Sequence, residues 1–387
     1  MKIGLFTDTY YPEINGVAAS VFLLRQELEK RGHEVYVFTT TAPGAPEEEE
    51  RVYRVPSMTL KFLSERRVGL FYQHKLDSII RGLNLDVIHT HTEFALGIFG
   101  RIVAAEHKIP TIHTYHTIYE DYTHYIAPIP VLDDGAKAFA RRYSKFFCNH
   151  GGHVVVPTEK VKHLLERYQV RTEISVIPTG IDLSKFDGSR YGAEMIADKR
   201  REVGLTGAEK VILYVGRVAP EKNIEELLRM LPTFFEKHED ARFLVIGSGP
   251  ALEDLKLVAE QEGMSRQVIF AGAKPWDEIG VYYALGDVFI SASQSETQGL
   301  TYIEAMAAGL PVVAKKDDCL QDVLTNGENG FAFETEEEFR SGLEAVLYGE
   351  KEYRANAKKA VEPYSKEVYA KRIEEIYLRK KKTFLSA

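Results

Sequence analysis

The segment VFISASQSETQGLTYIEAMAAGLPVVAKK, residues 288–316, has the pattern of a strand, a turn, a helix and a second strand. Two short apolar runs rich in β-branched residues, VFISAS and PVVAKK, stand at its ends. The stretch between them contains a glycine turn followed by a helical pattern. Strands that alternate with helices in this way form parallel sheets with helices on both faces. The segment therefore predicts an α/β fold.

The same alternation of strand and helix continues along the rest of the chain. Helical segments have apolar residues at spacings of three and four, for example at Val17, Val21, Leu24 and Leu28. Twelve short runs have the composition of buried strands: KIGLFTD, EVYVFTT, DVIHTHT, PTIHTYHT, HVVVPT, ISVIPTG, VILYVGR, ARFLVIGSG, QVIFAGA, VFISAS, PVVAKK and GFAFE. The pattern occurs twice, with a polar break around residues 182–192 between the two halves.

A chain of 387 residues has the length of two domains. We therefore predict two Rossmann-like domains that face each other across a cleft. The N-terminal domain is expected at residues 1–184 and the C-terminal domain at residues 185–365. The last helix, within residues 366–387, is expected to pack back on the first domain. Ligands of such sheets bind beyond the carboxyl ends of the strands, so the site is expected there.

Composition and charge exclude several classes of protein. Hydrophobic residues make up 44% of the chain and charged residues 27%, which excludes a disordered or fibrous protein. The net charge of −8 lies wholly in residues 191–387, so binding to nucleic acid is not expected. No apolar run has the length of a membrane span, and the start of the chain resembles a strand rather than a signal peptide. Two cysteines cannot form a disulfide framework, which favours the cytoplasm.

The loop VGRVAPEKN, residues 215–223, follows a predicted strand that ends at Gly216. A helix is expected to begin near Pro220, because proline is favoured in the first helical turn. Arg217 and Lys222 would then lie beside the exposed N–H groups of a helix N-terminus. Two cations at such a position can clamp a diphosphate. The alternative is a pair of solvated surface cations.

Residues 293–313 carry the most specific motif of the sequence. Glu296 precedes a glycine turn, and Glu304 lies inside the helix that follows. The N–H groups of Gly299, Leu300 and Thr301 are expected at the start of that helix, where they can bind phosphate. The two carboxylates can hold hydroxyl groups of the same ligand. Glu304 can instead be a surface or capping residue.

A second glycine turn, YYPEINGV at residues 10–17, lies between the first predicted strand and its helix. Gly16 would let the backbone approach an anionic ligand at the helix N-terminus. The alternative is an ordinary turn glycine.

Eleven of the twelve histidines lie before residue 170. The pairs His89-x-His91 and His113-x-x-His116 suggest zinc, and strand alternation places His89 and His91 on one face. No cysteine or carboxylate spacing completes a zinc site, however, and the chain has no Asp-x-Asp, so we expect no bound metal. His116 follows a strand end and is expected to hydrogen-bond a sugar hydroxyl or to stabilise charge.

Together these motifs resemble the retaining glycosyltransferases of the GT-B type, family four. The resemblance covers residues 1 to about 364 and rests on Gly16, Arg217, Lys222 and the Glu296-x7-Glu304 pair. It implies that the second domain binds a nucleotide-sugar donor without any required cofactor.

The resemblance also implies roles for the matching residues. In the second domain, Arg217 and Lys222 would hold the diphosphate, Glu304 the ribose and Glu296 the donor sugar. In the first domain, His116 would face the sugar from the other side, and Gly16 would close over the phosphates.

A narrower resemblance, to bacterial diacylglycerol 3-glucosyltransferases, rests on FTDTYYPEINGVAAS, HTHTEFALGIFG and IHTYHTIYEDYTHYI. It implies UDP-glucose as donor, 1,2-diacylglycerol as acceptor, and a peripheral position on the cytoplasmic face of the plasma membrane. Another sugar nucleotide, a second sugar on a glycolipid or a soluble acceptor remains the alternative. An epimerase or a metal-binding scaffold would be a more distant one.

A lipid acceptor requires contact with the bilayer, and residues 51–81 have a net charge of +5. Their basic residues are interleaved with leucine and phenylalanine, which suits an interfacial segment on anionic lipid. The expected contact residues are Lys61, Phe62, Arg66, Arg67 and Phe71. A second patch is expected at Arg141, Arg142, Lys145, Phe146 and Phe147. The alternative for residues 58–81 is two amphipathic helices packed on their own sheet.

Overall fold

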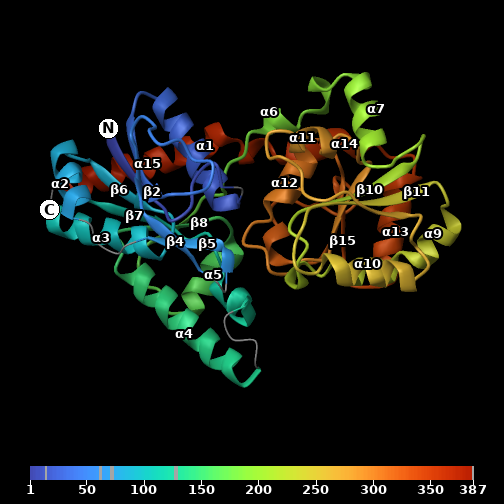
Figure 1. The fold of residues 1–387 in the computed structure, drawn as a ribbon, viewed down its shortest axis with the longest axis horizontal. Coiled ribbons are helices and arrows are strands. Elements are labelled where there is room, and N and C mark those ends of the chain that lie inside the picture. Colours follow the sequence, from blue (N-terminus) through green and yellow to red (C-terminus); the bar gives the residue numbers. More distant parts are fainter. Residues whose placement is uncertain (14, 61–62, 70–73, 126–129, 386–387) are drawn as a thin grey trace. The chain divides into compact units, whose positions relative to one another are not determined.

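The computed structural model describes all residues except 14, 61–62, 70–73, 126–129 and 386–387. At residues 58–60, 63–69, 74–75, 122, 124–125, 130–132 and 385 it describes the backbone alone. The chain forms two compact units (Figure 1). The first combines Met1–Gly180 with Lys366–Ala387, and the second is Ile181–Ser365. The change of unit thus comes four residues before the boundary expected from the sequence.

The first unit is built on a seven-stranded parallel sheet with the order β3-β2-β1-β6-β7-β8-β9. Its strands are β1 (Lys2–Phe6), β2 (Glu34–Thr40), β3 (Val52–Val55), β6 (Val87–Thr90), β7 (Thr111–Thr114), β8 (Val154–Val156) and β9 (Ile174–Val176). Its helices are α1 (Gly16–Lys30), α2 (His74–Leu83), α3 (Ala95–His107), α4 (Pro130–Asn149), α5 (Glu159–Arg167), α15 (Lys366–Leu385) and the 3₁₀ segment η1 (Tyr119–Tyr125).

Helices cover both faces of this sheet, because successive strand residues point to opposite sides. Leu5 of β1 packs with α1 and α15 on one face. Phe6, the next residue, packs with α2 and α3 on the other. Helix α1 begins where the Asn15 side chain accepts a hydrogen bond from the N–H of Ala18. Of the predicted apolar stripe, Val21, Leu24 and Leu28 are buried and Val17 is partly buried.

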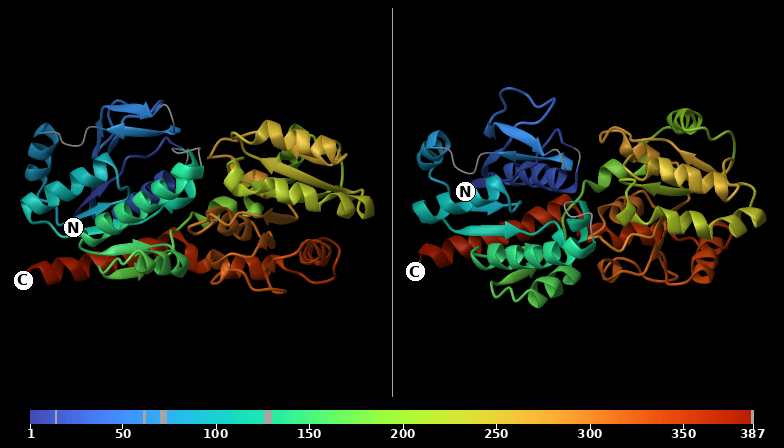
Figure 2. Two further views of the ribbon diagram at one scale, coloured as in Figure 1. Left: turned by 90° about the horizontal axis from the view of Figure 1, so that it is seen from below. Right: turned by 60° about the horizontal axis from the view of Figure 1, so that its bottom comes forward.

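The C-terminal helix α15 belongs to the first unit. Tyr369, Ile373 and Tyr377 of this helix are buried in one core with Ile3 and Val155 of the sheet. Figures 1 and 2 show α15, in red, running along that sheet. The first unit is therefore assembled from both ends of the chain.

The second unit repeats the architecture with six parallel strands in the order β12-β11-β10-β13-β14-β15. Its strands are β10 (Lys210–Val215), β11 (Ala241–Ile246), β12 (Val268–Phe270), β13 (Val288–Ser291), β14 (Val312–Lys315) and β15 (Gly330–Phe333). Its helices are α6 (Leu183–Phe186), α7 (Ala193–Glu202), α8 (Ile224–Met230), α9 (Pro232–Lys237), α10 (Leu252–Gln261), α11 (Ile279–Tyr283), α12 (Leu300–Ala307), α13 (Glu336–Leu347) and α14 (Arg354–Ala360), with 3₁₀ segments η2 (Gly188–Arg190), η3 (Pro220–Lys222), η4 (Asp318–Leu320) and η5 (Glu362–Tyr364).

The strand order of each sheet reverses at one place. In the first unit this place lies between β1 and β6, and in the second it lies between β10 and β13. The connections leave in opposite directions there, and in folds of this kind ligands bind beside such a position at the carboxyl edge of the sheet. These positions select the loops that follow β10 and β13 as a binding site.

All twelve predicted strands are present, and the prediction of an α/β fold with two Rossmann-like units is confirmed. Residues 57–60 and 63–69, however, form the antiparallel strands β4 (Ser57–Leu60) and β5 (Leu63–Gly69). The alternative of two amphipathic helices is therefore wrong for these residues, and α2 is the one helix among the described residues of 58–81. None of the helices in the described part of the chain combines the length and the apolarity of a membrane span.

Candidate functional site

The loop after β10 brings the two predicted cations to the switch point of the second sheet. The α-helix predicted to begin near Pro220 begins later than expected. Pro220–Lys222 form one 3₁₀ turn, and Asn223 then takes a left-handed conformation with φ of 52°, so α8 begins only at Ile224. Lys222 therefore lies in the turn ahead of the helix.

Both cations have carboxylate partners. The guanidinium of Arg217 is paired with the carboxylate of Glu221, a residue of the same loop. The ammonium of Lys222 lies 2.6 Å from Oε1 of Glu296, which follows β13. Strands β10 and β13 are neighbours in the sheet, so Lys222 and Glu296 meet although 74 positions separate them in the sequence. Glu296, the candidate for sugar binding, and Lys222, a candidate for diphosphate binding, are therefore in direct contact.

The turn after Glu296 ends at Gly299, which begins α12 in a left-handed conformation with φ of 72°. A Cβ atom at this position would lie 2.3 Å from the ring of Tyr302, so only glycine fits. No side chain caps this helix. The first N–H groups of α12, including those of Leu300 and Thr301, therefore remain available for an anion, as predicted for a phosphate site.

Glu304 lies one helical turn further along and is partly buried rather than a fully exposed surface residue. Its Oε2 accepts a hydrogen bond of 2.7 Å from the hydroxyl of Tyr283. Burial raises the pKa of Glu304 to about 7, and the Tyr283 bond and the nearby ammonium of Lys185 oppose the shift. Burial also lowers the pKa of Lys185 to about 8. A carboxyl group in these surroundings changes its charge near neutral pH.

Lys185 is a residue of this site that the sequence analysis missed. Its Nζ lies 3.1 Å from the ring centroid of Trp276 and has no hydrogen-bond partner. It belongs to α6, in the segment that enters the second unit. The sequence gives no sign that residue 185 lies near residue 304. The two residues are brought together by the packing of α6 on α12.

The other two predicted site residues belong to the first unit. Gly16 is the exposed first residue of α1, at a helix N-terminus, as expected. His116 lies two residues beyond β7 and is partly exposed. Its Nε2 lies 3.1 Å from Nδ1 of His91, which follows the neighbouring strand β6. Burial, together with a smaller effect of His113, lowers the pKa of His116 to about 3, so His116 is neutral at physiological pH.

Two other histidines of the expected group are held by hydrogen bonds. His89 contacts the hydroxyl of Tyr377 and that of Thr114, both at 2.7 Å. His113 contacts Thr90 through Nδ1 and Glu93 through Nε2. With both ring nitrogens engaged, neither histidine offers a free ligand atom to a metal ion.

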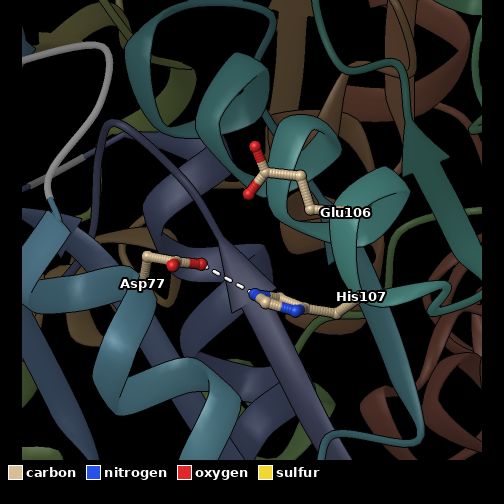
Figure 3. Close-up of side chains that lie close together, drawn as sticks. All are labelled: Asp77, Glu106 and His107. Carbon is tan, nitrogen blue, oxygen red and sulfur yellow. Dashed lines mark hydrogen bonds and ion pairs between the residues drawn. The ribbon is translucent and has the colours of Figure 1, made fainter.

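Among the described residues, Asp77, Glu106 and His107 are the one group of three with the spacing of metal ligands. Figure 3 shows the carboxylate of Asp77 bonded to His107, while the carboxylate of Glu106 carries no bond to either. The distance from Asp77 to His107 Nε2 is 2.7 Å, and Arg81 lies on the other carboxylate oxygen of Asp77. The cluster is best described as a hydrogen bond between Asp77 and His107 that joins α2 to α3.

The predicted membrane residues are described only in part. Lys61, Phe62 and Phe71 lie outside the described residues, and Arg66 and Arg67 are described by their backbone in β5.

In the second predicted patch, Phe147 is buried beneath the guanidinium of Arg101, so its assignment to the surface is wrong. Phe146 is 60% exposed and Phe139, one heptad earlier on α4, is 70% exposed. Arg142 lies between them on the surface, and Arg141 is paired with Glu120.

Sequence comparison gives two family matches. Residues 14–185 match Glycosyltransferase Family 4, and residues 195–363 match Glycosyl transferases group 1. The chain is 38% identical to alpha-monoglucosyldiacylglycerol synthase of Streptococcus pneumoniae over 380 residues, which cover 98% of this chain and 86% of that protein. It is 36% identical to the synthase of the same name from Acholeplasma laidlawii, over 98% of this chain and 97% of the other.

Structural comparison supports the same fold. HepE of Anabaena, solved in complex with UDP and glucose, superposes with a TM-score of 0.76 at 17% identity, over 98% of this chain and 100% of that one. Sucrose-phosphate synthase of Thermosynechococcus elongatus superposes with a TM-score of 0.74 at 20% identity, over the full length of both chains. At such identities the comparison establishes the GT-B fold.

Proposed function

The chain belongs to the family-four glycosyltransferases of the GT-B fold, and from this membership we propose that it transfers glucose from UDP-glucose to 1,2-diacylglycerol with retention. The product would be α-monoglucosyldiacylglycerol. The observation that carries the proposal is the identity of 36–38% to two alpha-monoglucosyldiacylglycerol synthases over nearly the whole chain. We further propose that the enzyme acts as a peripheral protein on the cytoplasmic face of the plasma membrane.

The residues of the second unit suit the departure of a nucleoside diphosphate. Charge develops on the leaving diphosphate as the glycosidic bond breaks, and fixed positive groups stabilise it. Arg217, Lys222 and the N–H groups at the start of α12 would supply that stabilisation. A retaining transfer needs no strong protein base if the leaving diphosphate accepts the proton of the acceptor hydroxyl. Glu296 would bind the sugar and Glu304 the ribose.

The test is to incubate the pure protein with vesicles that contain diacylglycerol and with radiolabelled UDP-glucose, UDP-galactose or GDP-mannose in turn. We expect a labelled lipid from UDP-glucose, with an α-anomeric signal by NMR. Label in a lipid from GDP-mannose alone would contradict the proposed donor. Label that appears only with monoglucosyldiacylglycerol in the vesicles would assign the second glycosylation step instead.

The partly buried carboxyl of Glu304 gives a pH prediction. An ionised carboxylate accepts both ribose hydroxyls, whereas the protonated form, favoured below its pKa of about 7, loses one acceptor. Affinity for UDP-glucose should therefore increase as the pH rises from 5.5 to 7.5, by up to about tenfold per pH unit below 7. Calorimetry would measure this, and Glu304→Gln should bind more weakly with a flat profile. A flat profile in the unmodified protein would contradict the ribose assignment.

We propose that the transfer requires no divalent metal ion, because side-chain cations and backbone N–H groups face the expected diphosphate. Activity should survive dialysis against EDTA, measured as lipid glucosylation before and after treatment. Loss of activity with rescue by manganese or zinc would contradict this part of the proposal.

The proposed membrane contact of residues 51–81 predicts dependence on anionic lipid. Each basic residue near an anionic surface contributes about 1 kcal/mol, so the Lys61, Arg66, Arg67→Ala variant should lose at most about 3 kcal/mol of vesicle affinity. Sedimentation with anionic vesicles should show the loss, and salt should reduce the difference by screening. Lipid glucosylation should fall, while slow hydrolysis of UDP-glucose should not change.

The matched control replaces exposed basic residues of the second unit, Arg201, Lys237 and Lys256, with alanine. This variant should sediment like the unmodified protein. If the Lys61, Arg66, Arg67→Ala variant sediments with vesicles as the unmodified protein does, the proposed membrane contact of residues 51–81 is contradicted. A Phe139, Phe146→Ala variant tests the exposed aromatic residues of α4 in the same assay.

A further inference from the structure

The imidazoles of His91 and His116 form a hydrogen-bonded pair at the carboxyl edge of the first sheet, in which His91 is buried and His116 is partly exposed. Nδ1 of His91 lies 3.1 Å from Nε2 of His116, and their ring planes differ by 25°. His91 is 1% exposed. Burial lowers the pKa of His91 well below its ordinary value, and neighbouring histidines add to the shift. Both rings are thus neutral at physiological pH, and one proton is shared between the two nitrogens.

The surroundings of His91 decide which nitrogen donates. Its Nε2 is buried and has no hydrogen-bond partner. A buried N–H without an acceptor is rarer and less favourable than a bare acceptor nitrogen. His91 therefore carries its proton on Nδ1 and donates it to Nε2 of His116. Since a neutral imidazole has one N–H, the proton of His116 lies on Nδ1.

The ring of His91 is packed against a second histidine, His89. Its ring lies 4.0 Å from the ring of His89, measured between centroids. His89 in turn is held at 2.7 Å by the hydroxyls of Tyr377 in α15 and Thr114 in β7. The C-terminal helix thus supports the pair through His89, whose ring packs against that of His91.

We propose that His91 is a positioning residue, whose Nδ1–H bond holds His116 in the Nδ1-protonated tautomer and so leaves that N–H as the hydrogen-bond donor that His116 offers to a sugar. This inference rests on the proposed function and on the sugar contact that the family resemblance implies for His116. The two ring nitrogens lie on different sides of an imidazole, so the bond to His91 leaves Nδ1–H of His116 as its one donor. Residues that orient a functional histidine through its second nitrogen act in this way at metal sites also.

Two substitutions at position 91 separate orientation from packing. His91→Phe keeps the ring but removes the donor, whereas His91→Asn places an N–H near the position of Nδ1. His91→Phe should lower kcat about 10- to 100-fold, as loss of an orienting partner does elsewhere, with little change in KM for UDP-glucose. His91→Asn should recover most of that loss. Circular dichroism and thermal unfolding control for folding.

A double-variant cycle and NMR complete the test. In the His116→Ala background, His91→Phe should cause no further loss, because the group that it positions is gone. The ¹⁵N shifts of the His116 ring should show protonated Nδ1 in the unmodified protein and in His91→Asn, and a change in His91→Phe. Unchanged shifts in His91→Phe, or equal kcat loss in Phe and Asn, would overturn the inference. The shifts need no turnover, so they decide the pairing even if UDP-glucose is not the donor.

Discussion

Glu296→Ala should lower kcat for lipid glucosylation by about 100- to 1,000-fold, the effect of removing one group that stabilises the reacting centre. The expectation follows from the proposed contact of Glu296 with the transferred sugar, which is strongest where the bond breaks. Affinity for UDP measured by calorimetry should change little, because UDP lacks the sugar. A variant that keeps its kcat would exclude Glu296 from the reacting centre.

The contact between Glu296 and Lys222 calls for a control in this experiment. The carboxylate lies 2.6 Å from the ammonium, so Glu296→Ala also releases Lys222. Glu296→Gln keeps an oxygen that can accept from Lys222 while removing the negative charge. If the loss comes from the sugar contact, both variants should be slow. If the Gln variant were fully active, the loss in Glu296→Ala would instead reflect a displaced Lys222.

Lys222→Ala should lower kcat/KM about 10- to 100-fold, since a hydrogen bond to a charged group contributes roughly 1.5–3 kcal/mol. In contrast to Glu296→Ala, it should also weaken UDP binding, because the diphosphate is common to UDP and UDP-glucose. Circular dichroism should be unchanged. The matched control is Lys256→Ala, an exposed lysine of α10 that is paired with Glu253. If Lys222→Ala is nearly as active as the control, the assignment of Lys222 to the diphosphate site is contradicted.

The parallel sheets were predictable because buried strands have a simple signature. Each predicted strand is a short apolar run between turn residues, and all twelve are found. Strand β3 was missed because Arg51 and Arg54 interrupt its apolar pattern at the sheet edge. The hairpin β4–β5 was missed for the same reason, since its basic residues suggested an interfacial segment. Charge on an edge strand hides it from a pattern based on hydrophobicity.

The site was predictable residue by residue but not as a set of contacts. Local patterns placed Lys222 and Glu296 at the ends of separate strands. That their side chains meet follows from the pairing of β10 with β13, a long-range feature. The start of α8 was misplaced because Pro220 begins a 3₁₀ turn, and the left-handed conformation of Asn223 ends that turn before the α-helix begins at Ile224. The partners of Glu304 and His116 depend on tertiary packing alone.

The return of α15 to the first unit has a consequence for the order of events during synthesis. The residues of the second unit, Ile181–Ser365, leave the ribosome before the helix that completes the first. Until then, α1 covers that sheet face alone, and the part that receives Tyr369, Ile373 and Tyr377 is open. The second unit, whose strands are contiguous in the chain, can therefore finish folding first, and the nascent first unit presents an apolar surface to chaperones until α15 has been synthesised.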